Sequence, residues 1–218
     1  MDNQCFSIAI DKRKVAEMPT VTFSGAITVV EQPADAAEAV RYLRQQSVVG
    51  FDTETKPNFR KGMTNRVSLI QVATEQHSFL FRINKMGLTP ELKEFMECDD
   101  IVKIGLSLKD DFHMLHMIGD FEPHNFVELQ EMVRKYHITD SSLQKIYAIL
   151  FNERISKGQR LTNWEAAKLT GPQMIYASID AWACLRIYKY LNSGQFDPSA
   201  SPYIVPDTPE ATPPVEQQ

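Results

Sequence analysis

The chain alternates short β-rich runs with helical runs, and this alternation constrains the fold more than any other feature of the sequence. Strand-like runs rich in β-branched and aromatic residues lie at 20–32, 48–55, 66–73, 77–83 and 101–106. Helical patterns lie at 33–46, 89–97, 126–136, 141–151 and 170–191. Three early strands joined by short connections, followed by β–α alternation and a helical second half, predict an α/β sheet with helices on both faces.

The chain length and the proline distribution predict one domain with two flanking segments. A chain of 218 residues with 43% hydrophobic content can bury one full core. We expect an N-terminal extension over 1–25 and the folded domain over 26–193. Prolines interspersed with Ser, Thr, Asp and Glu predict a disordered tail over 194–218.

Charge and cysteine content narrow the functional classes. The net charge is −5, so the chain lacks the overall basicity of proteins that grip many phosphates, although an enzyme that holds a strand end through metal ions could lack it too. The three cysteines form neither a disulfide framework nor a zinc pattern. There is no signal-peptide pattern and no apolar run long enough to span a bilayer. We therefore expect a cytoplasmic protein without membrane partners.

The strand-like run 48–55 contains two acidic residues inside an apolar segment. Asp52 and Glu54 are two positions apart, so on a strand their side chains project from the same face, while Phe51 and Thr53 project from the other. A buried carboxylate is costly unless a cation or hydrogen bonds compensate it. Alone, a D-x-E pattern is more often structural or on the surface.

A third acidic position requires a choice between neighbours. Leu108, Phe112 and Leu115 form an apolar arc at helical spacing, and Asp111 falls inside this arc. Asp110 lies towards the polar side, where it would complete a capping box with Ser107. We therefore select Asp111 as the candidate metal ligand and Asp110 as the cap. Taken alone, Asp111 could equally be a buried residue satisfied by backbone donors.

The long C-terminal helical run contains the last candidates. Thr170 and Gln173 predict a capping box at its start. Tyr176 and Asp180 are four positions apart, so they share one helix face. Because every one of these acids lies on the apolar side of its element, a shared divalent-metal centre explains them together, and carboxylate oxygens are the ligands that Mg²⁺ prefers.

The order D-x-E, then D, then Y-x-x-x-D resembles the DEDDy-type 3′–5′ exonuclease domains of the ribonuclease D and Werner-type family. The resemblance covers residues 26–193 and includes VSLIQVAT, KIGLSLKDD, RLTNWE and YASIDAWACLRIY. It implies a ribonuclease-H-like fold with a mixed sheet of about five strands. It also implies hydrolysis of phosphodiester bonds from the 3′ end of DNA or RNA, with release of nucleoside 5′-monophosphates.

The same resemblance implies the roles of the site residues. Asp52, Glu54 and Asp180 would bind a first Mg²⁺ or Mn²⁺ ion, Asp52 would bridge to a second, and Asp111 would hold that second ion. Tyr176 would position the attacking water, since a tyrosine with a pKa near 10 is a poor base at neutral pH. The implied catalytic set is therefore Asp52, Glu54, Asp111, Tyr176 and Asp180.

Two loops could contact the substrate. Lys157 and Arg160 resemble a basic stretch that faces the substrate in related enzymes, with a solvated charged loop as the equal alternative. Phe59 and Arg60 lie in the loop after Glu54, where an aromatic ring and a charge could hold a terminal base and phosphate; an ordinary solvated turn is the alternative there.

The main alternative function is a non-catalytic nucleic-acid-binding or adaptor module on the same fold. Loss of a metal ligand would indicate such a module, and every position of the acidic pattern is filled. The sequence leaves open the choice between DNA and RNA, the strand preference, the processivity and the oligomeric state.

Overall fold

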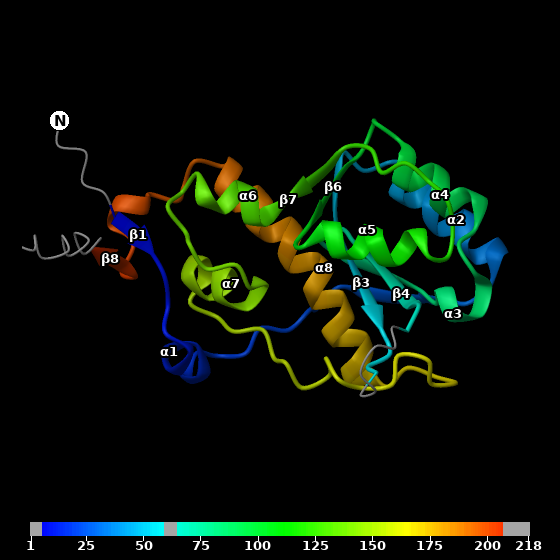
Figure 1. Ribbon diagram of the computed structural model, residues 1–218, viewed down its shortest axis with the longest axis horizontal. Helices are drawn as coiled ribbons and strands as arrows, with labels where there is room; N and C mark the ends of the chain where they lie inside the picture. The colour runs from blue at the N-terminus through cyan, green and yellow to red at the C-terminus, as the bar shows by residue number, and fades with distance from the viewer. Residues whose placement is uncertain (1–5, 59–64, 207–218) are drawn as a thin grey trace, which may run out of the picture.

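A computed structural model describes residues 6–58 and 65–206. Figure 1 shows the elements along the chain. The helices are α1 (Lys12–Glu17), α2 (Pro33–Leu43), α3 (Ile83–Met86), α4 (Pro90–Glu97), α5 (Leu108–His116), α6 (Leu129–Arg134), α7 (Leu143–Phe151), α8 (Gly171–Asn192) and the 3-10 helix η1 (Pro198–Ala200).

The centre of the molecule is a mixed six-stranded sheet with the strand order β2-β5-β4-β3-β6-β7. Its strands are β2 (Ala26–Val30), β3 (Val48–Thr55), β4 (Val67–Ala73), β5 (His77–Phe81), β6 (Val102–Gly105) and β7 (Phe126–Glu128). β3 pairs antiparallel with β4 and parallel with β6, so it lies in the middle of the sheet. The predicted α/β class and the mixed sheet are confirmed.

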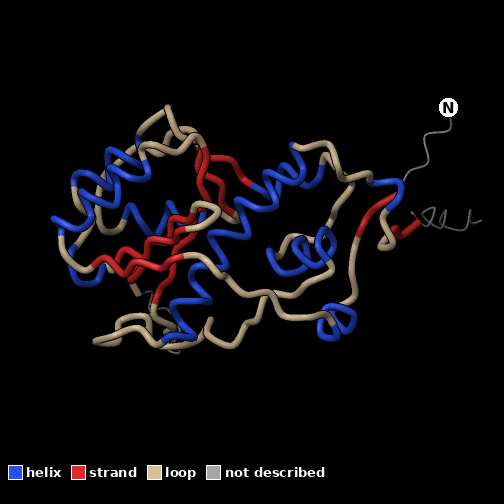
Figure 2. Tube along the Cα trace, turned by 180° about the vertical axis from the view of Figure 1, so that it is seen from behind, coloured by secondary structure: helices blue, strands red, loops and turns tan. Residues whose placement is uncertain are grey.

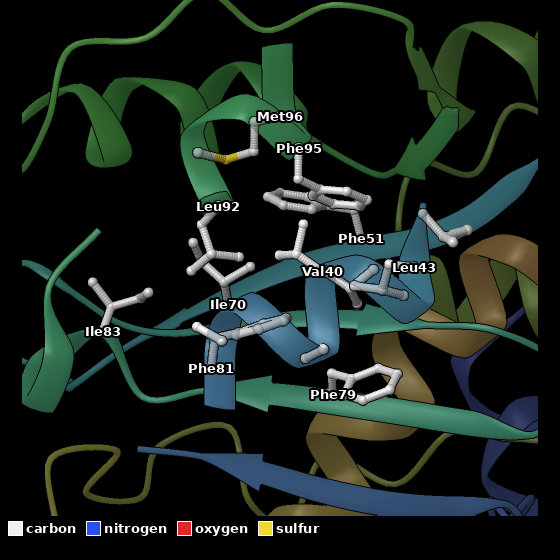
Figure 3. Packing of buried hydrophobic residues seen from close by; sticks show 14 of the residues in the cluster. Val40, Leu43, Phe51, Ile70, Phe79, Phe81, Ile83, Leu92, Phe95 and Met96 are labelled. Atoms are coloured by element: carbon white, nitrogen blue, oxygen red, sulfur yellow. The ribbon is translucent and has the colours of Figure 1, made fainter. Parts of the chain in front are cut away.

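Different helices cover the two faces of this sheet. On one face, α2 and α4 pack over the strands through a core that includes Phe51, Ile70 and Phe95 (Figure 3). On the other face, α8 runs along β3, β4 and β5, and α7 packs against α8 (Figures 1 and 2). No helix in the described part of the chain is both long and apolar enough to cross a membrane.

The start of α8 follows the predicted capping chemistry. The Thr170 hydroxyl accepts a hydrogen bond from the Gln173 backbone N–H, and the Gln173 side chain accepts one from the Thr170 N–H. Pro172 occupies the first turn, where a missing N–H costs nothing. The helix that contains Tyr176 and Asp180 therefore begins at a defined residue.

β3 and α8 approach each other most closely at Gly50. A Cβ atom built on Gly50 would lie 1.8 Å from the carbonyl oxygen of Ala181 and 3.3 Å from Cβ of Leu185. Real side chains do not tolerate the first of these separations. The backbone of α8 can lie directly on β3 because position 50 has no side chain.

The N-terminal and C-terminal segments pair with each other. β1 (Phe6–Ile8) forms an antiparallel two-stranded sheet with β8 (Ile204–Pro206), at the end of the molecule marked by the N label in Figure 1. The prediction of a disordered tail is therefore wrong for residues 194–206, where η1 and β8 form. Residues 207–218 lie outside the described part. The boundaries of the domain remain a prediction.

Candidate active site

β3 places two of the predicted acids side by side on the face of the sheet that α8 covers. In the β3–β4 ladder, Asp52 lies opposite Gln71 and Glu54 opposite Leu69. Phe51 points to the other face, where it is fully buried in the core shared with α2 and α4. The period of two along a strand explains this division. A register shift follows Glu54, so the regular pairing ends directly after the second acid.

α8 brings Asp180 to the same place. Asp180 is 7% exposed and Tyr176, one turn earlier, is 8% exposed. Asp52, Glu54 and Asp180 each offer a carboxylate oxygen, and these oxygens lie within 4.8 Å of one another. Three carboxylates that converge at this distance from two elements form a group that could hold a hard divalent cation.

Asp111 reaches the same cavity from α5 but lies outside the close group of three. The Thr53 hydroxyl donates a hydrogen bond to Oδ1 of Asp111. The negative charge of Asp111 contributes to the raised pKa of Asp52, so the two carboxylates interact. Asp110 is exposed, as the helical periodicity predicted.

The capping prediction for α5 is wrong. Ser107 precedes the helix with a φ of 65° and forms no side-chain capping hydrogen bond. The carboxylate of Glu128 caps the helix instead, accepting hydrogen bonds from the backbone N–H groups of Ser107 at 3.1 Å and Leu108 at 2.8 Å. A left-handed residue does not aim its side chain at the first turn as an ordinary N-cap residue does. Asp110 therefore has no capping-box partner.

Burial and mutual repulsion raise the pKa values of the clustered acids. Desolvation is the largest cause at every position, and neighbouring carboxylates add to it at Asp52, Glu54 and Asp111. The pKa of Glu54 rises to about 9, and those of Asp111 and Asp180 rise to about 7. The pKa of Asp52 also lies well above its ordinary value. The group therefore holds protons at a pH where exposed carboxylates are ionised, and a bound cation would displace them.

Burial likewise raises the pKa of Tyr176, and the charges of Asp180 and Glu54 raise it further. A hydrogen bond with the Tyr176 hydroxyl lowers the pKa of Asp180. Tyr176 is therefore a neutral phenol at physiological pH. It can orient a water molecule through its hydroxyl group, whereas it cannot act as an efficient base.

A cavity of about 470 Å³ is lined by all five predicted catalytic residues, together with Asp110, Lys157 and Arg160. The positive charge of Arg160 lowers the pKa of Glu54 and of Asp180, so its guanidinium lies close enough to act on both. Phe59 and Arg60 belong to residues outside the described part of the chain.

Sequence reasoning missed the polar contacts that surround Asp111 and the start of α5. Thr53 was assigned to the opposite face of the strand, and from there its hydroxyl meets α5. Gln130 donates hydrogen bonds from Nε2 to Oγ of Ser107 and to the carbonyl oxygen of Ser141. These contacts join positions 11 to 58 residues apart, and no local pattern indicates them.

A family model described as 3′–5′ exonuclease matches residues 27–194, most of the chain. The chain belongs to the 3′–5′ exonuclease family. The matched residues include both acids of β3, Asp111 of α5, and the Tyr176–Asp180 pair of α8.

Proteins with similar sequences include named exonucleases. The chain is 30% identical to the mouse bifunctional 3′-5′ exonuclease/ATP-dependent helicase WRN over 186 residues, which cover 81% of this chain and 13% of that protein. It is 28% identical to ribonuclease D of Haemophilus influenzae over 169 residues, covering 75% of this chain and 41% of that protein. The chain therefore spans much less than two thirds of the length of either protein.

Solved structures share the fold. The Nibbler EXO domain of Aedes aegypti superposes with a TM-score of 0.71 at 24% identity, covering 83% of this chain and 96% of that one. Ribonuclease D of Escherichia coli superposes with a TM-score of 0.68 at 20% identity, covering 77% of this chain and 44% of that one.

Proposed function

We propose that this protein is a metal-dependent exonuclease that removes nucleoside 5′-monophosphates from the 3′ end of a nucleic acid strand. The observation that supports this most directly is the meeting of Asp52, Glu54 and Asp180 within 4.8 Å. Membership of the 3′–5′ exonuclease family supports attack from the 3′ end.

The donor set fits divalent cations. In the proposal, Asp52, Glu54 and Asp180 hold one Mg²⁺ or Mn²⁺ ion, and Asp52 and Asp111 hold a second. All four ligands offer oxygen, which suits hard cations. Their raised pKa values come from burial and, at Asp52, Glu54 and Asp111, from neighbouring carboxylates, and the charge of Arg160 offsets this only in part. A bound pair of ions would lower the pKa of a water molecule and stabilise the attacking and leaving oxygens of the phosphodiester.

The chain's own side chains would position the reactants. Tyr176 is neutral and hydrogen-bonded to Asp180, so its hydroxyl can orient the attacking water beside the ligand cluster. Lys157 and Arg160 line the same cavity and are the candidate contacts for the phosphates near the strand end. Phe59 and Arg60 remain predicted contacts for the terminal base.

The direct test uses 5′-labelled DNA and RNA strands with Mg²⁺, Mn²⁺ or a chelator. A ladder that shortens from the 3′ end, depends on metal and releases 5′-monophosphates is expected on at least one polymer. Binding without cleavage in every metal condition would instead indicate an adaptor module. The polymer that is degraded identifies the substrate class.

Asp110 and Asp111 provide a matched pair for this test, because they are adjacent and share a side-chain chemistry. Asp111→Asn is expected to lower kcat by about a hundredfold or more, in the range seen when one stabilising group is removed from an active site. Asp110→Asn removes the same charge from an exposed position of the same cavity, outside the predicted ligand set, and should lower kcat far less than Asp111→Asn does. Equal losses in both variants would contradict the assignment of Asp111.

A further inference from the structure

A second cavity of about 230 Å³ adjoins the active-site cavity and has a different electrostatic character. The two cavities share Ser142, Gln144 and Lys157 as lining residues, so they lie next to each other. The second is also lined by Lys12, Lys145 and Arg154. Among its described lining residues there are four cations and no carboxylate. This concentration of positive charge contrasts with the net charge of −5 of the whole chain.

One wall of this cavity comes from the N-terminal extension. α1 lies beside α7 and contributes Lys12, Val15 and Ala16 to the lining (Figure 1). The family match begins at residue 27, so α1 lies outside the part of the chain that the exonuclease model covers. The cationic cavity is therefore formed jointly by the family domain and by a segment added to it.

Hydrogen bonds on both sides fix α1 in place. Before the helix, the backbone N–H of Ile10 donates to Oδ2 of Asp140 at 2.8 Å, and Asp140 also pairs with Lys145 at 2.6 Å. After the helix, Nε of Arg154 donates to the carbonyl oxygen of Met18 at 2.9 Å. These contacts hold α1 against the family domain independently of any ligand.

The cations of the cavity differ in how fully the protein itself neutralises them. Lys145 is paired with Asp140, so its charge is largely balanced. Within the described part of the chain, no salt bridge joins Lys12, Arg154 or Lys157 to a carboxylate. Lys12 and Lys157 are both exposed, and they come from two different segments, α1 and the loop after α7. Unpaired cations in a cavity beside the proposed nuclease site suit a polyanion.

We propose that this cationic cavity, called the groove below, binds the sugar-phosphate backbone of a single-stranded nucleic acid. The bound part of the strand lies upstream of the 3′ end that enters the active site. This inference rests on the proposed exonuclease function. It assigns to the N-terminal extension the role of holding the part of the strand that is not yet being cut. Short products would leave because they no longer reach Lys12.

The test compares Lys12→Glu with Arg41→Glu, which makes the same change from cation to anion at an exposed position on α2, away from the groove. The first measurement is the affinity for a labelled single strand of about 12 nucleotides, within the site sizes of single-strand grooves. It is made with chelator present, so that no cleavage occurs. Lys12→Glu is expected to weaken binding about fivefold at 0.1 M salt. The slope of the logarithm of the binding constant against the logarithm of the salt concentration should become shallower by about 0.7, the change expected for the loss of one phosphate contact.

The second measurement is cleavage of the long strand and of a dinucleotide by the same variants. Lys12→Glu should raise KM for the long strand about fivefold, as one lost phosphate contact predicts, and leave kcat unchanged. It should not affect the dinucleotide, which is too short to reach the groove. Arg41→Glu should behave as the unmodified protein on both substrates, and both variants should keep its thermal midpoint.

The possible failures are distinguishable. If the unmodified protein cleaves strands and Lys12→Glu behaves like Arg41→Glu, the groove proposal is wrong and the exonuclease proposal stands. The groove proposal is also wrong if Lys12→Glu affects the dinucleotide and the long strand equally. If strands bind in a Lys12-dependent way and are never cleaved, the proposed activity is wrong and the groove stands as a binding surface.

Discussion

The protein buries positive charge and negative charge in opposite ways. The side chain of Arg82 is 0% exposed, and its guanidinium donates to Glu31 at 3.3 Å, to Asn84 at 3.3 Å and to the carbonyl oxygen of Ala166 at 2.5 Å. The buried ammonium group of Lys103 donates to the carbonyl oxygens of Phe95 and Cys98. Both cations find their acceptors within the protein.

The buried acids are compensated less completely. The charge of Arg160 acts on Glu54 and Asp180, and hydroxyl groups of Thr53 and Tyr176 hydrogen-bond to Asp111 and Asp180. In the described part of the chain, no lysine or arginine forms a salt bridge with Asp52, Glu54, Asp111 or Asp180. Their pKa values rise because burial and neighbouring carboxylates disfavour the charged form. The comparison teaches that a buried charge with internal partners stabilises the fold, whereas a buried group of like charges requires a ligand from outside.

The largest expected effect is that of Asp52→Asn on activity. Loss of the central ligand should lower kcat/KM by at least about a thousandfold, which corresponds to about 4 kcal/mol of transition-state stabilisation. The unfolding free energy of the chelated protein should not fall, because the amide relieves repulsion among the acids. Nuclease assays and chemical denaturation measure the two quantities. A variant that keeps its activity, or that unfolds much more readily, would contradict the idea that the buried acids serve a ligand and not the fold.

Arg82→Met is expected to show the reverse pattern. Removal of a buried cation with three internal acceptors should lower the unfolding free energy by about 3 kcal/mol. At temperatures where the variant stays folded, kcat should change little, because Arg82 does not line the active-site cavity. Chemical denaturation gives the first value and single-turnover cleavage the second.

Lys85→Met is the matched control, because Lys85 pairs with the same Glu31 carboxylate from a more exposed position. Lys85→Met should lower the unfolding free energy by no more than about 1 kcal/mol, as for other exposed ion pairs. Equal costs for both variants would show that burial is not what distinguishes Arg82.

Tyr176→Phe tests a neutral group placed among the acids. Its phenol is hydrogen-bonded to Asp180, and removing the hydroxyl group should lower kcat by about 10- to 100-fold while KM stays similar. The measurement is the rate of mononucleotide release as a function of pH. A shifted alkaline limb in the variant would indicate that tyrosine ionisation contributes, against the positioning role.

The smallest effect concerns pH and stability. The pKa values of Asp111 and Asp180 near 7, and of Glu54 near 9, exceed the ordinary values of 3.8 and 4.5. At pH values between the ordinary and the raised pKa values, the folded state binds more protons than the unfolded state. The stability of the folded state therefore falls as pH rises from about 5 to about 9. Metal binding requires deprotonated ligands and therefore becomes more favourable over the same interval.

The measurement is the thermal midpoint with Mg²⁺ and with chelator, at pH about 6 and about 8.5. The increase in the thermal midpoint due to Mg²⁺ should be larger at the higher pH. Each additional kcal/mol of stabilisation by Mg²⁺ should raise the midpoint by about 3 °C in a chain of this size. Asp52→Asn should lose most of the gain. A gain that does not depend on pH would mean that the acids are already ionised without metal.

Much of the fold was predictable because its signals are local. The central strand that contains Asp52 and the capping box of Thr170 and Gln173 follow from short patterns of residue type. The choice of Asp111 over Asp110 followed from helical periodicity. Both residues line the cavity, but Asp111 is half-buried and accepts a hydrogen bond from Thr53, whereas Asp110 is exposed.

The features that escaped prediction depend on distant partners. The strand β8 has three exposed residues ending in Pro206, and only its pairing with β1 makes it a strand. Glu128 caps α5 across 20 residues of chain, since Ser107 adopts a left-handed conformation that its sequence context does not indicate. The groove beside Lys12 requires knowing where α1 lies relative to α7, which no local pattern specifies.

Gly50 has a consequence for the spacing of the clustered acids, of which Asp52 lies two residues away. The peptide carbonyl of Ala181 occupies the space where a methyl group would be, and Ala181 directly follows Asp180. Any larger residue at this point would push the helix outward and carry Asp180 with it. The separation of the carboxylates thus depends on one missing carbon atom, and a screen of single substitutions by activity would detect this position although it bears no reactive group.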